Sequence, residues 1–244
     1  MNTLPTQQAR PSLTGHTTWP GQRGFTLVEI AIVMVVLGLL LGGVLAPLSA
    51  RQEQDRRDKN AALLDQAREA LIGYALTNRR LPCPDTDGSG QENGCAPFDP
   101  SIAPATGRLP WVTLGIAAKF DAWGNPHQIH YTVNRAFTSN NPLTFFTLTT
   151  AGTGNGIIEV HSNAATCNTN NKQVANNVPA LIWSSAQNDY ASQGSVDEQE
   201  NLNGDRCYVF REYNIAKNQE FDDQMVWLSP GILFNRMIEA GQLP

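Results

Sequence analysis

Apolar positions fall into one long unbroken run near the N-terminus and several short runs after it. The long run extends from Phe25 to Ala46 and contains only apolar residues, Gly, Thr and one acid, Glu29. A helix needs about 20 apolar residues to cross the hydrocarbon core of a bilayer, so this run predicts a membrane-spanning helix. A carboxylate inside such a segment is costly and usually has a function, which makes Glu29 a candidate functional residue.

A helical pattern of a different kind follows the apolar run. From Ser49 to Asn78 there is no Pro, and the apolar positions Leu64, Ala67, Leu71 and Tyr74 share one helical face. The opposite face carries the acids Asp55, Asp58, Asp65 and Glu69. This spacing predicts an amphipathic helix. We therefore expect one long helix over residues 25–78, ended by the prolines at 82 and 84.

The rest of the chain is rich in short β-type runs. The predicted strands are His127–Val133, Leu143–Thr150, Ile157–His161, Ala180–Ser185, Cys207–Tyr213 and Gln224–Ser229. Residues 81–110 are interpreted as a loop, 151–156 as a Gly-rich hairpin turn, 186–206 as a polar flexible segment and 232–240 as a short helix. The expected fold class is α+β, with the long helix packed on an antiparallel sheet of a head formed by residues 79–244.

Composition and charge narrow the class of protein. The 244 residues are 41% hydrophobic and 16% charged, which suits one globular domain with one anchor. The net charge of −5 argues against nonspecific binding of nucleic acid. Residues 1–24 are polar and rich in Thr, Gln and Pro, and we expect them to form a separate leader.

All four cysteines, Cys83, Cys95, Cys167 and Cys207, lie after the anchor. An even number of cysteines in an exported domain favours disulfides. Of the three possible pairings we favour Cys83–Cys95 with Cys167–Cys207, because the first closes a short loop rich in Pro and Gly. The alternative is a zinc site, but no CxxC spacing exists and no His lies near a Cys in the sequence.

Residues 85–90 have the Asp-x-Asp-x-Ser-Gly pattern that begins a calcium loop, with Asp85, Asp87 and Ser89 as candidate ligands. The twelfth position is Ala96, so the bidentate Glu of an EF-hand is missing. A solvated Asp/Gly turn explains the same pattern without a metal. The sequence favours the turn and leaves the calcium site as the alternative.

No enzymatic motif is present in the sequence: there is no Gly-x-Ser-x-Gly elbow, no His-Glu-x-x-His and no phosphate-binding loop. His127 and His130 are three apart on a predicted strand, where they face opposite sides. Asp222 and Asp223 are adjacent, and a surface or turn position is expected for them. We conclude that the chain is not an enzyme.

The residues Gly24-Phe25-Thr26-Leu27-Val28-Glu29 before the apolar run resemble the cleavage and methylation motif of type IV prepilins, which include the pseudopilins of type II secretion. Residues 121–126 (DAWGNP) are similar to a segment that leads into the head sheet of pseudopilins. The resemblance implies a pilin-like fold. It also implies cleavage between Gly24 and Phe25 by a prepilin peptidase, N-methylation of Phe25, and an assembly role for Glu29 beside the N-terminal amine of a neighbouring subunit.

Two functions are therefore expected. The first is a structural subunit, of the minor type because of its length, in a type IV pilus or type II secretion pseudopilus. Its partners would be the peptidase, other pilin or pseudopilin subunits and the inner membrane, with a cytoplasmic N-terminus and a periplasmic head before extraction into a filament. The alternative is a membrane-anchored periplasmic binding module that never polymerises and holds calcium or a partner through the loop 85–96 and the acidic segment 186–206.

Overall fold

The computed structural model describes residues 24–96, 99, 102–124, 126–138, 157–167, 169, 173–187 and 194–243, without the side chains of 41–48. The chain divides into two compact units, residues 1–50 and 51–244. One helix, α1 (Leu27–Asn78), contributes to both units. It begins two residues after the start of the long helix expected over 25–78 and ends at the same residue. The expected strand at 143–150 and the hairpin turn at 151–156 lie outside the described residues.

The second unit contains two sheets. The first has the order β1-β2-β5-β7, formed by β1 (Ala105–Arg108), β2 (His130–Val133), β5 (Ala180–Ser184) and β7 (Gln224–Trp227). All three strand pairs in it are antiparallel, which confirms the expected sheet. The second sheet has the order β4-β3-β6, formed by β4 (Gln173–Ala175), β3 (Glu159–His161) and β6 (Cys207–Val209). Its β3–β6 pair is parallel, which the sequence did not indicate.

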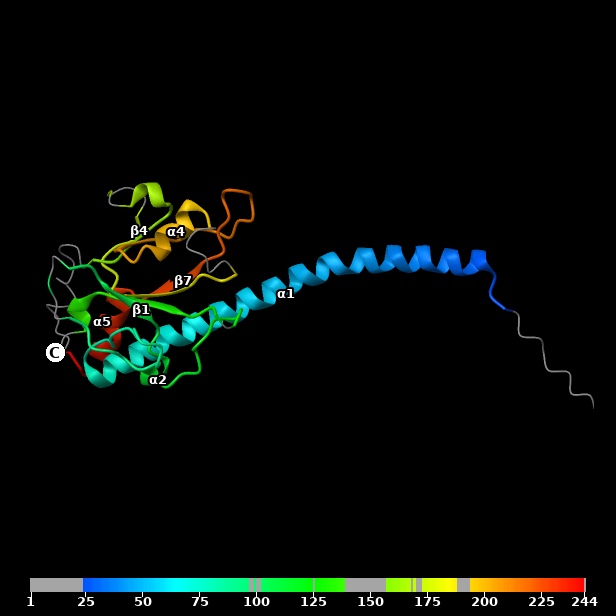
Figure 1. Cartoon of the computed structure of the whole chain (residues 1–244). Coiled ribbons are helices and arrows are strands. Elements are labelled where there is room, and N and C mark those ends of the chain that lie inside the picture. Colours follow the sequence, from blue (N-terminus) through cyan, green and yellow to red (C-terminus); the bar gives the residue numbers. More distant parts are fainter. Residues whose placement is uncertain are drawn as a thin grey trace, which may run out of the picture. The chain divides into compact units, whose positions relative to one another are not determined.

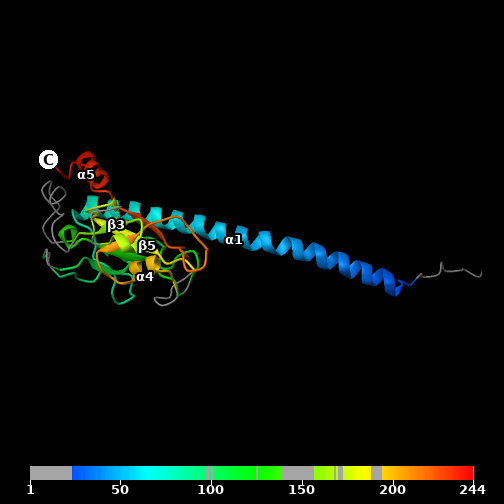
Figure 2. The same cartoon turned by 90° about the horizontal axis from the view of Figure 1, so that it is seen from above.

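Strand β5 separates two hydrophobic cores. Its residues Ala180 and Ile182 belong to the first core, with Leu64, Ala67 and Leu71 of α1. Its residues Leu181 and Trp183 belong to the second core, with residues of the second sheet. Successive side chains of a strand point to opposite faces, so the first sheet is covered on both sides. In Figure 1, the part of α1 that belongs to the second unit runs along one side of β1 and β7, and β4 and α4 lie on the other. Seen from above, β3, β5 and α4 superpose, as stacked layers do (Figure 2).

Short helices complete the second unit. They are α2 (Trp111–Leu114), η1 (Arg135–Phe137), η2 (Ala164–Thr166), α4 (Val196–Leu202) and α5 (Pro230–Glu239). The buried Leu233 and Met237 of α5 pack in the first core, as expected for the C-terminal helix.

Two sequence interpretations were wrong in part. The expected loop 81–110 contains β1, and the expected flexible segment 186–206 contains α4. Helix α4 has few apolar residues, but Ser195 caps it and the Glu198 side chain accepts a hydrogen bond from the Ser195 N–H. This reciprocal capping box stabilises a helix that hydrophobic periodicity does not reveal.

Candidate functional site

The first candidate site is the start of α1. Gly24, Phe25 and Thr26 precede the helix, which begins at Leu27. The Phe25 side chain is 77% exposed. The peptide bond between Gly24 and Phe25 therefore lies outside the helix, in a stretch without regular secondary structure.

Glu29 lies in the first turn of α1 and faces back toward Thr26. The backbone N–H of Glu29 donates to Thr26 Oγ1 over 3.2 Å, and the Thr26 N–H lies 3.5 Å from Glu29 Oε2. This is the reciprocal arrangement of a capping box, in which a Thr and a Glu three residues later satisfy unpaired donors at a helix start. The carboxylate thus lies close to the segment in which cleavage is expected.

The helix behind Glu29 exposes its apolar side chains. Within the first unit, Leu27, Val28, Ala31, Ile32, Val35 and Val36 line a shallow apolar groove. Among the residues that the structure describes, no helix contains an apolar stretch long enough to cross a membrane. Residues 41–46 of the expected span are outside the described side chains.

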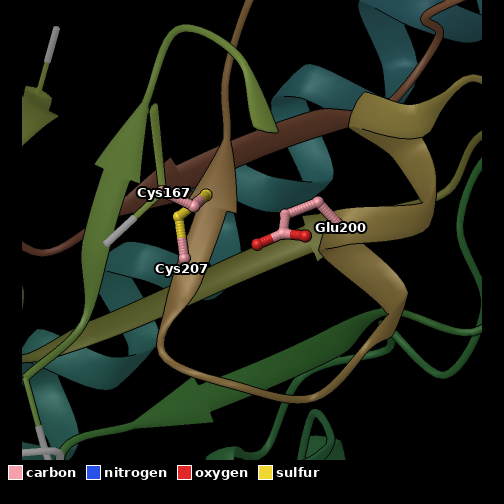
Figure 3. A group of neighbouring side chains, drawn as sticks. All are labelled: Cys167, Glu200 and Cys207. Atoms are coloured by element: carbon pink, nitrogen blue, oxygen red, sulfur yellow. A yellow bond between two sulfur atoms is a disulfide. The ribbon is translucent and has the colours of Figure 1, made fainter. Parts of the chain in front are cut away.

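Both expected cysteine pairs are bonded: Cys83 to Cys95, and Cys167 to Cys207. Glu200 lies beside the second pair (Figure 3), and its carboxylate and the two sulfur atoms are within 4.8 Å of one another. Zinc binds the thiolate form of cysteine. Because both sulfur atoms are in a disulfide, this group does not form a zinc site.

The loop with the calcium-like pattern uses its carboxylates for its own backbone. Asp85 is 1% exposed, and its two oxygens accept hydrogen bonds from the N–H groups of Asp87, Gly88 and Gly90. Asp87 accepts from the Ser89 N–H, and hydrogen bonds from the Ser89 hydroxyl and N–H lower the pKa of Asp87 to about 2. The geometry is that of the Asx turn that the sequence favoured. Calcium binding by Asp85, Asp87 and Ser89 stays a prediction.

Glu92 connects this loop to the end of α1. Arg80 donates to both Glu92 oxygens over 2.7 and 2.6 Å, and the Tyr74 hydroxyl donates over 2.8 Å. Burial raises the pKa of Glu92, but hydrogen bonds from Arg80, Tyr74 and the Cys83 N–H outweigh it, so the pKa is lowered. Burial, and then the hydrogen bond to Glu92 and its charge, raise the pKa of Tyr74 to about 12.

The segment similar to pseudopilins is a turn anchored by Asp121. Its Oδ1 accepts from the N–H groups of Trp123 and Gly124, and its Oδ2 accepts from the Ser184 hydroxyl over 2.6 Å. Gly124 has φ +82°, a conformation that favours glycine. The turn is therefore tied to β5, with Asp121 buried and Trp123 partly buried.

Sequence reasoning missed one cluster of ionisable groups. Glu198, Asp222 and Asp223 are all buried, and oxygens of the three carboxylates lie within 4.8 Å of one another. Burial, and then the charge of Glu198, raise the pKa of Asp222 to about 7. Burial raises the pKa of Asp223 well above its ordinary value. The surface or turn position expected for Asp222 and Asp223 is wrong, because both side chains are buried beside α4.

Comparison with known proteins gives matches at the N-terminal site. Residues 19–45 match the family described as the prokaryotic N-terminal methylation motif. The chain is 31% identical over 110 residues to the type II secretion system core protein G of Pectobacterium carotovorum subsp. carotovorum, covering 44% of this chain and 66% of that protein. The protein of the same name from Klebsiella pneumoniae is 43% identical over 61 residues, which are 25% of this chain and 44% of the relative.

A third relative is matched over more of its length. The type II secretion system core protein G of Aeromonas hydrophila is 31% identical over 112 residues, covering 44% of this chain and 72% of that protein. The chain thus spans two thirds or less of the first two relatives and more of the third. No solved structure matches the chain significantly.

Proposed function

Because the chain belongs to the pseudopilin family of the type II secretion system core protein G, we propose that it is a structural subunit of a pseudopilus or of a related type IV pilus. In this proposal a prepilin peptidase removes residues 1–24, and the new amine of Phe25 is methylated. The observation that carries the proposal is the start of α1, where an exposed Gly24-Phe25 bond precedes a capped helix with exposed apolar side chains.

Assembly would use the apolar surface of α1 and the carboxylate of Glu29. Leu27 (86% exposed) and Met34 (67% exposed) are left uncovered by the part of the chain that the structure describes, so neighbouring helices or lipid would cover them. A carboxylate in apolar surroundings is stabilised by a nearby ammonium group, and the processed N-terminus of a neighbour would supply one.

The two disulfides support the proposal that the head lies in an oxidising compartment such as the periplasm, because disulfides form and persist there. The N-terminus would then be cytoplasmic and the subunit anchored in the inner membrane until its extraction into the filament. We propose a minor rather than a major subunit. The match to the Pectobacterium relative covers a smaller share of this chain than of that protein, so this chain is the longer one.

The first test is the intact mass of the protein isolated from native membranes. A chain that begins with N-methyl-Phe25 is the expected result. A chain that retains Met1, or that is cut elsewhere, would contradict the proposal and favour an anchored module that never polymerises.

The second test compares Glu29→Ala with Glu29→Gln. The amide oxygen of Gln can still accept a hydrogen bond at the start of α1, but the side chain carries no charge. Glu29→Gln therefore removes only the charge, whereas Glu29→Ala removes both the charge and the capping hydrogen bond. If a neighbour's amine needs the charge, both variants are processed and neither enters the filament. Asp55→Ala, an exposed acid later in α1, is the control and should assemble normally. Normal assembly of Glu29→Ala would refute this role.

A further inference from the structure

The disulfide between Cys167 and Cys207 has an acid beside it, and three separate elements of the head supply these side chains. Cys167 directly follows η2, Cys207 begins β6, and Glu200 belongs to α4. Figure 3 shows the Glu200 carboxylate directed toward the two sulfur atoms. One of its oxygens and both sulfur atoms lie within 4.8 Å of one another. Two sulfur ligands and one oxygen ligand are thus gathered at one point.

The charges around this group favour a cation. Burial, and then the charge of Asp205, raise the pKa of Glu200, and the charge of His161 lowers it by a smaller amount. Glu159 of β3 is paired with Cys207 in the parallel β3–β6 ladder, so its side chain lies on the same face of the second sheet. Two thiolates formed beside these carboxylates would repel them unless a positive ion joined the group.

Reduction would make the two sulfur atoms available as ligands. In the oxidised head they are bonded to each other, whereas zinc binds the thiolate form of cysteine. Cys167 is partly exposed and Cys207 is buried, so a dithiol reductant would attack Cys167 Sγ through its thiolate. The bond between the two sulfur atoms then breaks and Cys207 leaves as a thiolate. The second thiol of the reductant releases Cys167, and the reductant departs as a cyclic disulfide while its two protons remain for the two cysteines.

We propose that this reduction converts the group into a zinc site with Cys167, Cys207 and Glu200 as its protein ligands. Thiolates and carboxylates are both ligands of zinc in proteins, and binding releases the thiol protons. A tetrahedral ion with Zn–S distances of about 2.3 Å separates two sulfur ligands by roughly 3.8 Å. The Cα atoms of the two cysteines are 5.8 Å apart, so both side chains can reach one ion. Water would take the fourth position, because Glu200 is partly exposed.

A zinc ion would join more of the head than the disulfide does. The disulfide connects the end of η2 to β6, and the metal would connect α4 to both. Helix α4 already contacts β6 and η2. The ring of residues 167–207 would therefore stay closed in a reducing environment. Held by the metal, its two thiols would also be kept from pairing with Cys83 or Cys95 before oxidation.

The test uses the purified full-length chain in detergent, reduced with dithiothreitol and desalted under nitrogen. After equilibration with ZnCl₂, we expect the reduced chain to hold one more Zn²⁺ than the oxidised chain by elemental analysis. Zinc should raise the melting temperature of the reduced chain by roughly 5–10 °C at a hundred times the dissociation constant. Cobalt(II) in place of zinc should show the charge-transfer absorption of thiolate–metal bonds.

Two glutamate variants test the oxygen ligand. Glu200→Gln removes the charged ligand and should bind zinc at least about tenfold more weakly in the reduced state. Glu212→Gln changes an exposed acid shortly after β6 and should bind as the wild type does. Equal affinities of the two variants would contradict the role of Glu200.

The first disulfide supplies the control for the cysteines. Replacing Cys83 and Cys95 together by Ser removes the other pair of thiols and should leave zinc uptake unchanged. Replacing Cys167 and Cys207 together by Ser should abolish it. The reverse result would overturn the proposal. If the second double variant does not fold, Glu200→Gln gives the answer, because it keeps all four cysteines.

The wild-type protein gives an independent answer. Equal zinc uptake by the oxidised and reduced chains would show the proposal to be wrong. So would a reduced chain that takes up no zinc, or that stays unfolded, at about 10 µM zinc.

Discussion

At the scale of single residues, Glu92 has the most connected charged side chain described in the first disulfide loop. It accepts from Tyr74 in α1, from Arg80 just after α1, and from the Cys83 N–H. Hydrogen bonds between charged groups stabilise more than neutral ones, and losing one partner leaves the others unsatisfied. Glu92 thus fixes the position of the loop relative to the end of the helix.

We predict that Glu92→Gln lowers the free energy of unfolding by about 1–2 kcal/mol at pH 7. The pKa of Glu92 is lowered in the folded state, so its contribution is complete above the ordinary pKa of a glutamate and is lost as the pH falls through the lowered value. The difference between the wild type and the variant should therefore shrink at acidic pH. Thermal unfolding at several pH values measures it.

Glu69→Gln is the matched control, because Glu69 is an exposed acid on α1, the helix whose end Glu92 contacts. An exposed ion pair contributes little, so its effect should stay below about 0.5 kcal/mol. Equal effects of the two variants would mean that the contacts of Glu92 do not stabilise the head.

At the scale of elements, the sequence predicted those with strong periodicity. The stripe of Leu64, Ala67 and Leu71 is buried, and the acids Asp55, Asp58, Asp65 and Glu69 are exposed, as the helical pattern required. Strand β5 and helix α5 were also located, because their apolar runs are dense. The start of α1 was identified from Gly24, Phe25 and Glu29.

Strand β1 and the carboxylate cluster were missed because they depend on partners rather than on their own residues. Strand β1 (ATGR) has weak strand propensity and forms because it pairs with β2. The carboxylate cluster brings Glu198 close to Asp222, 24 positions later in the sequence. No local sequence pattern predicts a contact between residues so far apart. A signal for α4 was present: Ser195 followed three residues later by Glu198 is the sequence of a capping box.

We predict that Gly194→Ala destabilises the head by about 1–3 kcal/mol. A methyl group at position 194 would meet the Glu198 carboxylate and lie 2.9 Å from Glu198 Cβ, which disturbs the cap of α4. Gly73→Ala is the control, because nothing lies within 4 Å of that position in α1. Alanine there should be neutral or stabilise the helix by up to about 1 kcal/mol. Thermal unfolding that ranks the two variants in the opposite order would contradict the prediction.

At the scale of the whole molecule, the relatives account for less than half of the chain. The match to the Aeromonas protein covers 44% of its residues. The described part of the head contains a second sheet beside the antiparallel one, and the hydroxyl groups of Thr132 and Tyr208 connect the two at 2.7 Å.

The bond between Cys167 and Cys207 closes a ring that contains β4, β5 and α4. A polypeptide cut inside that ring stays in one piece, since the two fragments remain joined through sulfur. An engineered protease site after Gln187 should thus give a cleaved protein that migrates as one species in SDS until a reductant is added. A site after residue 150 lies between this ring and the one closed by Cys83 and Cys95. Cutting there should release two fragments even without a reductant. The segment from β4 to Cys207 at the start of β6 is thereby protected against loss by a single proteolytic event, whereas β3 and the chain between the two disulfide rings are not.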